Sequence, residues 1–170
     1  LWFTSSFRMC CRKLNCRCTQ YIIIGLGEWR NLCLAKEVDY IYFNAGHWDI
    51  AHWSGDAETL TSVEEYAANI KKIIRLMKNY FPNAKICFTT TTPMNPTHPF
   101  TSNPRSNEEI RKYNEAGVHA AIEMGIQTDD LYSFAENWDE SCFEDYCHFT
   151  PTGFERLGRR VADRIRREIE

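Results

Sequence analysis

The chain has 170 residues, of which 44% are apolar, and a formal net charge of −3. This length and apolar content suffice for one domain with its own core, so we expect a single domain over residues 1–170. The weakly acidic charge provides no field that attracts nucleic acid or an anionic membrane surface. The apolar run Tyr21–Ile24 is too short to cross a bilayer, and no signal peptide is recognisable. We therefore expect a cytoplasmic protein, although the chain does not begin with Met.

The first predicted elements are a strand and a long helix. Ile41–Phe43 is short and apolar, which is typical of a buried strand. Ser62 and Glu65 form a capping-box pattern, in which the Ser hydroxyl and the Glu carboxylate each satisfy a free backbone N–H. Apolar residues then recur at helical spacing as far as Tyr80. The pattern predicts a helix over residues 62–80.

A second strand, a long loop and a second helix follow. Residues 84–92 are apolar and β-branched, which indicates a strand, and Pro93 ends it. The proline-rich segment 94–105 predicts a surface loop, and long loops in small domains are often functional. Ser106 and Glu109 form another capping box, which predicts the start of the second helix.

The last part of the chain predicts a short strand and a final helix. Gly125 is a natural stop for the second helix, and residues 126–128 suggest the strand. Thr150 and Pro151 suit the N-cap and first position of the final helix. The apolar stripe expected to face inward on this helix consists of Phe154, Leu157, Val161, Ile165 and Ile169.

The alternation of strands and helices predicts an α/β domain with a mostly parallel sheet. In such sheets, functional sites form on loops beyond the carboxyl ends of the strands. Residues 44–49 and 93–105 each follow a predicted strand, and residues 145–148 precede the final helix. We expect these three loops to share one rim of the sheet.

Asp145 and His148 lie three residues apart on the last of these loops. At this spacing a carboxylate can hold one imidazole nitrogen and leave the other free to accept a proton from a nucleophile, as in a catalytic triad. The alternative is that Asp145 caps a turn and His148 is a surface residue. We interpret the pair as an orienting acid and a general base.

The loop after the first strand contains groups that suit an oxyanion site. A glycine such as Gly46 lets the backbone approach a ligand closely, and the Asn44 amide can donate to a developing negative charge. Both residue types are also common in ordinary turns. Side chains that can ligate a metal lie nearby, namely His47, Asp49, His52 and Asp56. Nothing else supports a metal there, so we expect surface or supporting histidines and no metal site.

The chain contains eight cysteines, four of them near its start, at Cys10, Cys11, Cys16 and Cys18. Zinc sites usually separate paired thiols by roughly two to four residues, and this spacing fits that rule poorly. A thiol-rich metal-binding protein is therefore the less favoured alternative. Cys87 lies in the second predicted strand and is expected to be a small buried apolar residue.

Taken together, the motifs resemble the SGNH/GDSL hydrolase superfamily over most of the chain. The matching segments are Val38–Asp49, Glu65-Tyr66, Phe81–Ile86, Thr90–Pro93, Arg105–Ile110 and the terminal Asp145-x-x-His148 with Gly153. The resemblance implies a three-layer α/β/α sandwich of flavodoxin-like type with a mostly parallel sheet. It also implies a serine esterase or acyl hydrolase that needs no metal and no organic cofactor.

The nucleophile block of that family, Gly-Asp-Ser at the end of the first strand, is altered in this chain. The corresponding segment is Phe3–Met9, in which Thr4 replaces the Gly and Ser5 replaces the Asp. The resemblance makes Ser6 the nucleophile and Ser5 the next candidate. The alternative is that both are ordinary N-terminal serines.

Further departures concern the groups that would face the oxyanion. Cys16 occupies the position of a family glycine, where its backbone N–H remains available. Trp48 stands where the family commonly has an Asn, so Asn44 is our substitute for that donor. Too few residues follow Met9 for the usual crossover helix, since a parallel crossover needs about a dozen residues. We expect a shortened first crossover and an atypical N-terminal segment over residues 1–20.

The expected activity is hydrolysis of an ester by a triad of Ser6, His148 and Asp145. Its substrate is expected to be a small-molecule or carbohydrate ester. The reactions considered include deacetylation of a carbohydrate or lipid-type ester. The residues expected at the oxyanion and the substrate are Cys16, Asn44, Gly46 and Trp48. The alternative is a catalytically inactive remnant of the same fold that acts as a binding module.

Arg105 and the proline-rich loop are expected to shape the acyl or alcohol pocket. Trp48 and Trp53 suit stacking on a sugar and equally suit a core. The sequence predicts no oligomeric state.

Overall fold

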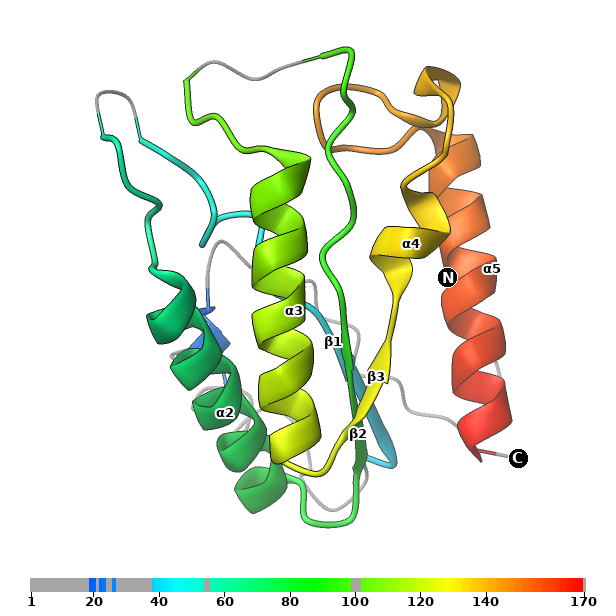
Figure 1. The fold of residues 1–170 in the computed structure, drawn as a ribbon. Coiled ribbons are helices and arrows are strands. Elements are labelled where there is room, and N and C mark those ends of the chain that lie inside the picture. Colours follow the sequence, from blue (N-terminus) through cyan, green and yellow to red (C-terminus); the bar gives the residue numbers. More distant parts are fainter. Residues whose placement is uncertain are drawn as a thin grey trace.

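The computed structural model describes residues 19–20, 22–23, 26, 38–53, 56–98 and 102–169. Figure 1 shows the elements after residue 38. In chain order they are β1 (Tyr40–Phe43), α2 (Val63–Tyr80), β2 (Lys85–Thr89), α3 (Asn107–Glu123), β3 (Gln127–Asp129), α4 (Leu131–Ala135), the 3-10 helix η2 (Glu140–Cys142) and α5 (Pro151–Ile169). The strands pair in the order β1-β2-β3, and both pairs are parallel. The predicted α/β class with a parallel sheet is confirmed.

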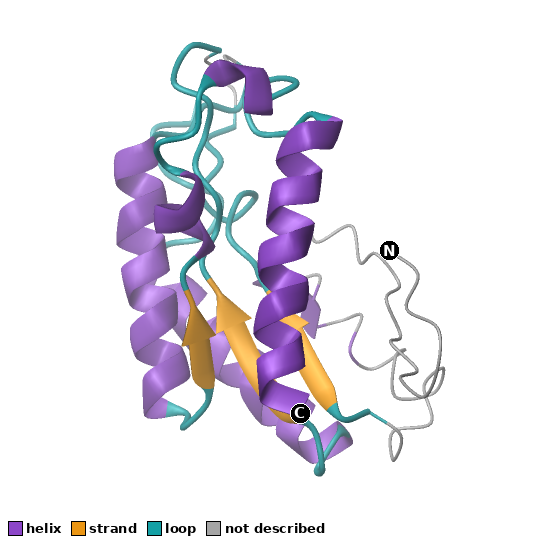
Figure 2. Ribbon diagram, turned by 90° about the vertical axis from the view of Figure 1, so that its right-hand side faces the viewer, coloured by secondary structure: helices purple, strands orange, loops and turns teal. Residues whose placement is uncertain are grey.

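Helices cover both faces of the sheet. Figure 2 shows α5 on one side of the strands and the α2–α3 pair on the other. The alternation along β2 agrees, because Ile86 and Phe88 belong to the core with α2 and α3, whereas Cys87 faces Arg164 of α5. The expected three-layer α/β/α sandwich is therefore confirmed. Within the described residues, no helix is both long and apolar enough to cross a membrane.

Local capping sets the starts of α2 and α3 as predicted. The Ser62 hydroxyl accepts a hydrogen bond from the Glu65 amide at 3.2 Å, and the Glu65 carboxylate returns to the Ser62 amide. Ser106 and Glu109 repeat the arrangement at the start of α3. Each box satisfies two backbone N–H groups that a helix start would otherwise leave free.

The second strand is shorter than predicted and ends at Thr89. Beyond it, the backbone of Thr91 pairs with a side chain of α3: the Thr91 amide donates to Asn114 Oδ1 at 2.7 Å, and Asn114 Nδ2 donates to the Thr91 carbonyl at 2.9 Å. This tertiary pairing replaces the sheet ladder although the residues are β-branched. The short helices α4 and η2 were not predicted.

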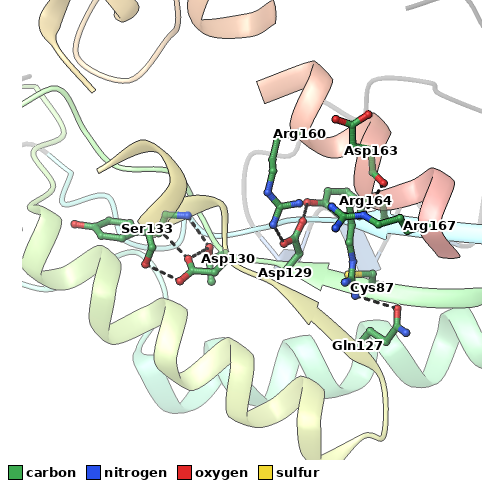
Figure 3. Close-up of polar contacts among 12 residues, drawn as sticks. Cys87, Gln127, Asp129, Asp130, Ser133, Arg160, Asp163, Arg164 and Arg167 are labelled. Atoms are coloured by element: carbon green, nitrogen blue, oxygen red, sulfur yellow. Dashed lines mark hydrogen bonds and ion pairs between the residues drawn. The ribbon is translucent and has the colours of Figure 1, made fainter. Parts of the chain in front are cut away.

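The final helix begins as predicted but contacts the sheet differently. Pro151 is its first residue, and Thr150 Oγ1 accepts from the Gly153 amide at 3.4 Å. The predicted inward stripe is wrong at its first position, because Phe154 is 57% exposed and Gly153 is the buried residue of α5. Polar groups make much of the contact instead: Arg160 pairs with Asp129 of β3, and Arg164 donates to Gln127 (Figure 3).

Candidate active site

A pocket of about 290 Å³ lies at the carboxyl ends of β1 and β2. Its walls come from the three loops that the sequence placed on one rim. The lining residues are Asn44, Ala45, Gly46, His47 and Trp48 after β1, Thr92 and Arg105 after β2, and Tyr146, Cys147, His148, Phe149 and Phe154 around the start of α5. Ligand sites of α/β proteins form at this edge of the sheet, so the pocket is the candidate active site.

Asp145 and His148 form a hydrogen-bonded pair, of which His148 lines the pocket. Asp145 Oδ2 lies 2.7 Å from His148 Nδ1. The other carboxylate oxygen, Oδ1, accepts hydrogen bonds from the backbone amides of Cys147 and His148, each at 2.8 Å. These backbone hydrogen bonds therefore fix the carboxylate independently of its contact with the ring. Because Nδ1 is engaged, Nε2 is the nitrogen left for proton transfer.

The environment keeps Asp145 ionised. Partial burial disfavours the charged form, but hydrogen bonds from the Cys147 amide, the His148 amide and the His148 ring outweigh it, and the pKa of the Asp145 carboxyl lies below its ordinary value. An ionised carboxylate accepts a hydrogen bond from Nδ1–H and so selects the tautomer whose Nε2 is unprotonated. That tautomer is the one a general base requires.

The backbone at Gly46 is fixed by two hydrogen bonds to the preceding carbonyl. Tyr66 Oη donates to the Ala45 carbonyl at 2.8 Å, and Thr91 Oγ1 donates to it at 2.9 Å. In a trans peptide the next N–H points the opposite way, so the Gly46 amide is directed away from these core partners. A Cβ at position 46 would overlap Thr91 Oγ1, and φ there is 154°. Both observations explain the glycine.

Asn44 and Trp48 also line the pocket, with different roles. Asn44 is exposed, and its Nδ2 makes a long contact of 3.5 Å to the Thr90 carbonyl. Trp48 stacks on Trp53 at 6.0 Å between ring centroids, and the Arg105 guanidinium lies 5.1 Å from the Trp48 ring. Asn44 therefore keeps donor capacity at the pocket, whereas Trp48 contributes mainly a ring face.

The acidic and histidine side chains after β1 do not form a metal site. Asp49 is fully buried and accepts hydrogen bonds from the Thr19 amide and hydroxyl. His52 does not line the pocket, and its Nε2 is 2.6 Å from Glu109 Oε1. His47 is not a surface histidine, because both of its ring nitrogens are buried and without a hydrogen-bond partner.

Among the described residues, one group of side chains brings three metal-ligating atoms within 4.8 Å of one another: Asp145, Cys147 and His148. Two of these residues are already bonded to each other through Oδ2 and Nδ1. Burial also raises the pKa of the Cys147 thiol, which disfavours the thiolate that a metal needs. The group therefore suits proton transfer better than metal binding.

The remaining predicted site residues lie outside the described residues. These are Ser6, Ser5 and Cys16, and the other cysteines of the N-terminal group are outside them too. The expected shortened first crossover falls in the same segment. Their roles stay predictions.

Several lining residues were not singled out from the sequence, namely Thr92, Tyr146, Cys147 and Phe149. Their place in the pocket could be predicted in part from the sequence. Tyr146 and Cys147 lie between Asp145 and His148, and Phe149 follows directly. Residues that flank His148 on a short loop are placed beside it by chain connectivity alone.

The fold and the pocket define an α/β/α domain with an acid–histidine pair at the carboxyl edge of its sheet, as in a hydrolase. The model of the GDSL-like lipase/acylhydrolase family matches residues 20–156 of this chain. That match covers most of the chain and includes Asp145 and His148. The chain therefore belongs to the GDSL-like lipase/acylhydrolase family.

Individual relatives agree with this assignment. The chain is 28% identical over 140 residues to the GDSL esterase/lipase WDL1 of Oryza sativa subsp. japonica, which covers 76% of this chain and 53% of that protein. Among solved structures, the lipase/acylhydrolase from Enterococcus faecalis superposes with a TM-score of 0.64 at 17% identity, covering 87% of this chain and 70% of the other. Est24, a carbohydrate acetylesterase from Sinorhizobium meliloti, gives 0.61 at 15% identity, covering 86% and 66%.

With these solved structures the chain shares the fold. The chain spans about half the length of the curated relatives it matches.

Proposed function

We propose that this chain hydrolyses esters through a serine, with His148 as general base and Asp145 as the acid that orients it. The single observation that carries the proposal is the 2.7 Å contact between Asp145 Oδ2 and His148 Nδ1 at the wall of a pocket. The names of the curated relatives, which are esterases or lipases, support the same chemistry.

In this mechanism Ser6 is the nucleophile. Its Oγ attacks the ester carbonyl carbon while His148 Nε2 accepts the hydroxyl proton. The tetrahedral intermediate collapses, and the alcohol leaves with that proton. Water then attacks the acyl-enzyme by the same route, which releases the acid and restores Ser6.

The oxyanion of the intermediate requires donors fixed in advance. The Gly46 amide is the best-supported donor, because the hydrogen bonds to the Ala45 carbonyl hold this peptide in one orientation. Asn44 Nδ2 is a second donor, and the Cys16 amide a third. An acetylated carbohydrate is a suitable substrate, since Trp48 and the 48%-exposed Trp53 present stacked rings at and beside the pocket.

The first prediction tests this mechanism with short-chain p-nitrophenyl esters. His148→Ala and Ser6→Ala should each lower kcat by at least about a hundredfold, because the proton acceptor or the attacking atom is lost. Asp145→Asn should lower kcat strongly as well, since an amide no longer fixes the tautomer. His119→Ala, at an exposed position of α3 outside the pocket, should leave activity within about twofold.

Other outcomes assign the roles differently. Loss of activity in Ser5→Ala with full activity in Ser6→Ala would make Ser5 the nucleophile. Full activity in His148→Ala would refute the mechanism.

A specific observation favours a second candidate, a binding module without catalysis. The family match begins at residue 20 and leaves out Ser6, and the segment before it has Thr4 and Ser5 where the resemblance calls for Gly and Asp. This candidate predicts no hydrolysis of any tested ester by the wild-type chain, together with saturable binding of an ester in the pocket. Calorimetric titration of wild-type and Trp48→Ala chains would measure that binding.

A further inference from the structure

Unpartnered polar atoms gather in one wall of the pocket. Nε and Nη2 of Arg105 and both ring nitrogens of His47 are buried without a hydrogen-bond partner. Folded proteins seldom leave such atoms unsatisfied, and a buried charge without a counter-charge is especially costly. Four unsatisfied atoms in two side chains that line one pocket therefore indicate a place where a polar ligand group binds.

The Arg105 guanidinium is positioned by aromatic rings and lies beside the Cys147 thiol, and no described carboxylate forms an ion pair with it. Its central carbon lies 5.1 Å from the Trp48 ring centroid and 5.8 Å from that of Tyr146. The backbone beside it is also held, because the His52 amide donates to the Pro104 carbonyl at 3.2 Å. Stacking uses the faces of the guanidinium plane and leaves its edges for hydrogen bonds.

The two unpartnered nitrogens of Arg105 form one donor edge. Nε–H and one N–H of Nη2 lie on the same side of the planar group and point in nearly the same direction. This fork matches the two oxygens of a carboxylate, which it binds through a pair of parallel hydrogen bonds. The unsatisfied atoms thus have the geometry of a carboxylate-binding group.

His47 adds a neutral donor to the same wall. Burial, helped by the positive charges of Arg105 and His148, lowers the pKa of His47 to about 3. At neutral pH the ring is uncharged and carries one N–H donor, so it does not add a second unpaired charge beside Arg105. A carboxylate, which only accepts hydrogen bonds, complements one cation and up to three N–H groups.

We propose that Arg105 and His47 bind a carboxylate of the substrate, so that the chain prefers esters whose acyl or alcohol part carries a carboxylate. This proposal about substrate preference rests on the proposed ester hydrolysis. Since both Arg105 nitrogens are covered in this structure, the carboxylate reaches them after a neighbouring side chain rotates, while Arg105 stays in place; such rotations are common at binding sites. Arg105 is then a specificity-determining residue of the pocket.

The experiment compares each carboxylated ester with its own methyl ester. For the alcohol side, the pair is p-acetoxybenzoate and methyl p-acetoxybenzoate. For the acyl side, it is the mono-p-nitrophenyl ester of adipate and the corresponding p-nitrophenyl methyl diester. The wild-type chain should show a kcat/KM ratio of roughly ten or more in favour of the carboxylate in one pair, because a site built for hydrogen bonding discriminates against analogues that lack the group.

Two variants of Arg105 test the cause of the preference. Arg105→Lys keeps the charge but loses the two-pronged edge, and Arg105→Gln loses both, so each should reduce the ratio about tenfold. Arg156→Gln is the matched control, because Arg156 also stacks on an aromatic ring, 4.2 Å from Trp138, but lies outside the pocket lining. Its ratio should equal that of the wild type.

A ratio near one in both wild-type pairs, or an unchanged ratio in Arg105→Lys, would overturn the proposal. If circular dichroism shows that the Arg105 variants do not fold, inhibition decides: adipate should inhibit the wild type more strongly than dimethyl adipate, and equal inhibition would refute the site.

If the wild type hydrolyses none of the four esters, the proposed function fails, and the carboxylate site is tested on its own. Calorimetric binding of p-acetoxybenzoate, compared with its methyl ester, should then favour the carboxylate, and equal binding would refute the site.

Discussion

His47 shows how a single buried ring links stability to pH. Its pKa is about 3 in the folded chain because burial disfavours the charged form, against an ordinary value of 6.5. Between these two values the unfolded chain binds a proton that the folded chain does not. The free energy of unfolding therefore falls as pH drops through this window, and the contribution of His47 is complete above pH 6.5.

The prediction is that His47→Gln weakens this pH dependence. The wild type should lose up to about 1.4 kcal/mol more unfolding free energy per pH unit than the variant near the middle of the window. Urea unfolding at pH 6.5, 5.5 and 4.5 measures the difference, with exposed His98→Gln as the control. Parallel pH profiles for the wild type and His47→Gln would contradict the assignment.

At the scale of elements, the helix starts could be predicted from local sequence patterns, whereas contacts between distant parts of the chain could not. Both capping boxes involve atoms three residues apart, so their geometry follows from the sequence once a helix forms. The end of β2 depends on Asn114, which lies 23 residues from Thr91, and no local rule indicates that pairing. Phe154 has an apolar side chain at a helical position, yet burial depends on what the rest of the fold places opposite it.

Gly153 couples α5 to the loop that carries His148. A Cβ there would lie 2.5 Å from the Cys142 carbonyl oxygen and 3.0 Å from Phe149 Cβ. Since the first obstacle is the backbone carbonyl at the end of η2, Gly153→Ala must displace α5 from η2. We expect a loss of about 1–3 kcal/mol in stability, as for other overpacked sites, and weaker ester hydrolysis.

Thermal unfolding and kcat together test the coupling. Thr152→Ala, at the exposed neighbouring position, should change stability by less than about 0.5 kcal/mol. A Gly153→Ala chain with wild-type stability and activity would show that the helix accommodates the methyl group.

At the scale of the whole molecule, the site depends on how the third layer attaches to the sheet. The periodicity of α5 predicted a helix there, and the family resemblance implied the third layer. The sequence also predicted the pairing of Asp145 with His148, because the two are close along the chain. The sequence did not predict that His47 and Arg105 line the pocket with buried nitrogens that have no hydrogen-bond partner. These residues are 58 positions apart in the chain, and their neighbourhood depends on β1 and β2 pairing in parallel.

The ion pair between Arg160 and Asp129 is the clearest test of that attachment. Asp129 is 5% exposed at its side chain and also accepts a hydrogen bond from Tyr42 Oη at 2.7 Å, whereas Arg160 is 27% exposed. Arg160→Met would leave the buried carboxylate without its cation. Because removing one partner of a buried pair costs about 3–5 kcal/mol and this pair is partly hydrated, we expect a loss of roughly 2–3 kcal/mol.

The adjacent Arg159 provides a matched control. It pairs with Glu155 on the exposed surface of the same helix, so Arg159→Met should cost less than about 1 kcal/mol. Urea unfolding measures both variants. Equal, small losses would mean that charge does not hold α5 on β3. A large loss confined to Arg160→Met, accompanied by lower ester hydrolysis, would mean that the helix beginning just after His148 must be anchored at β3 for the pocket to keep its geometry.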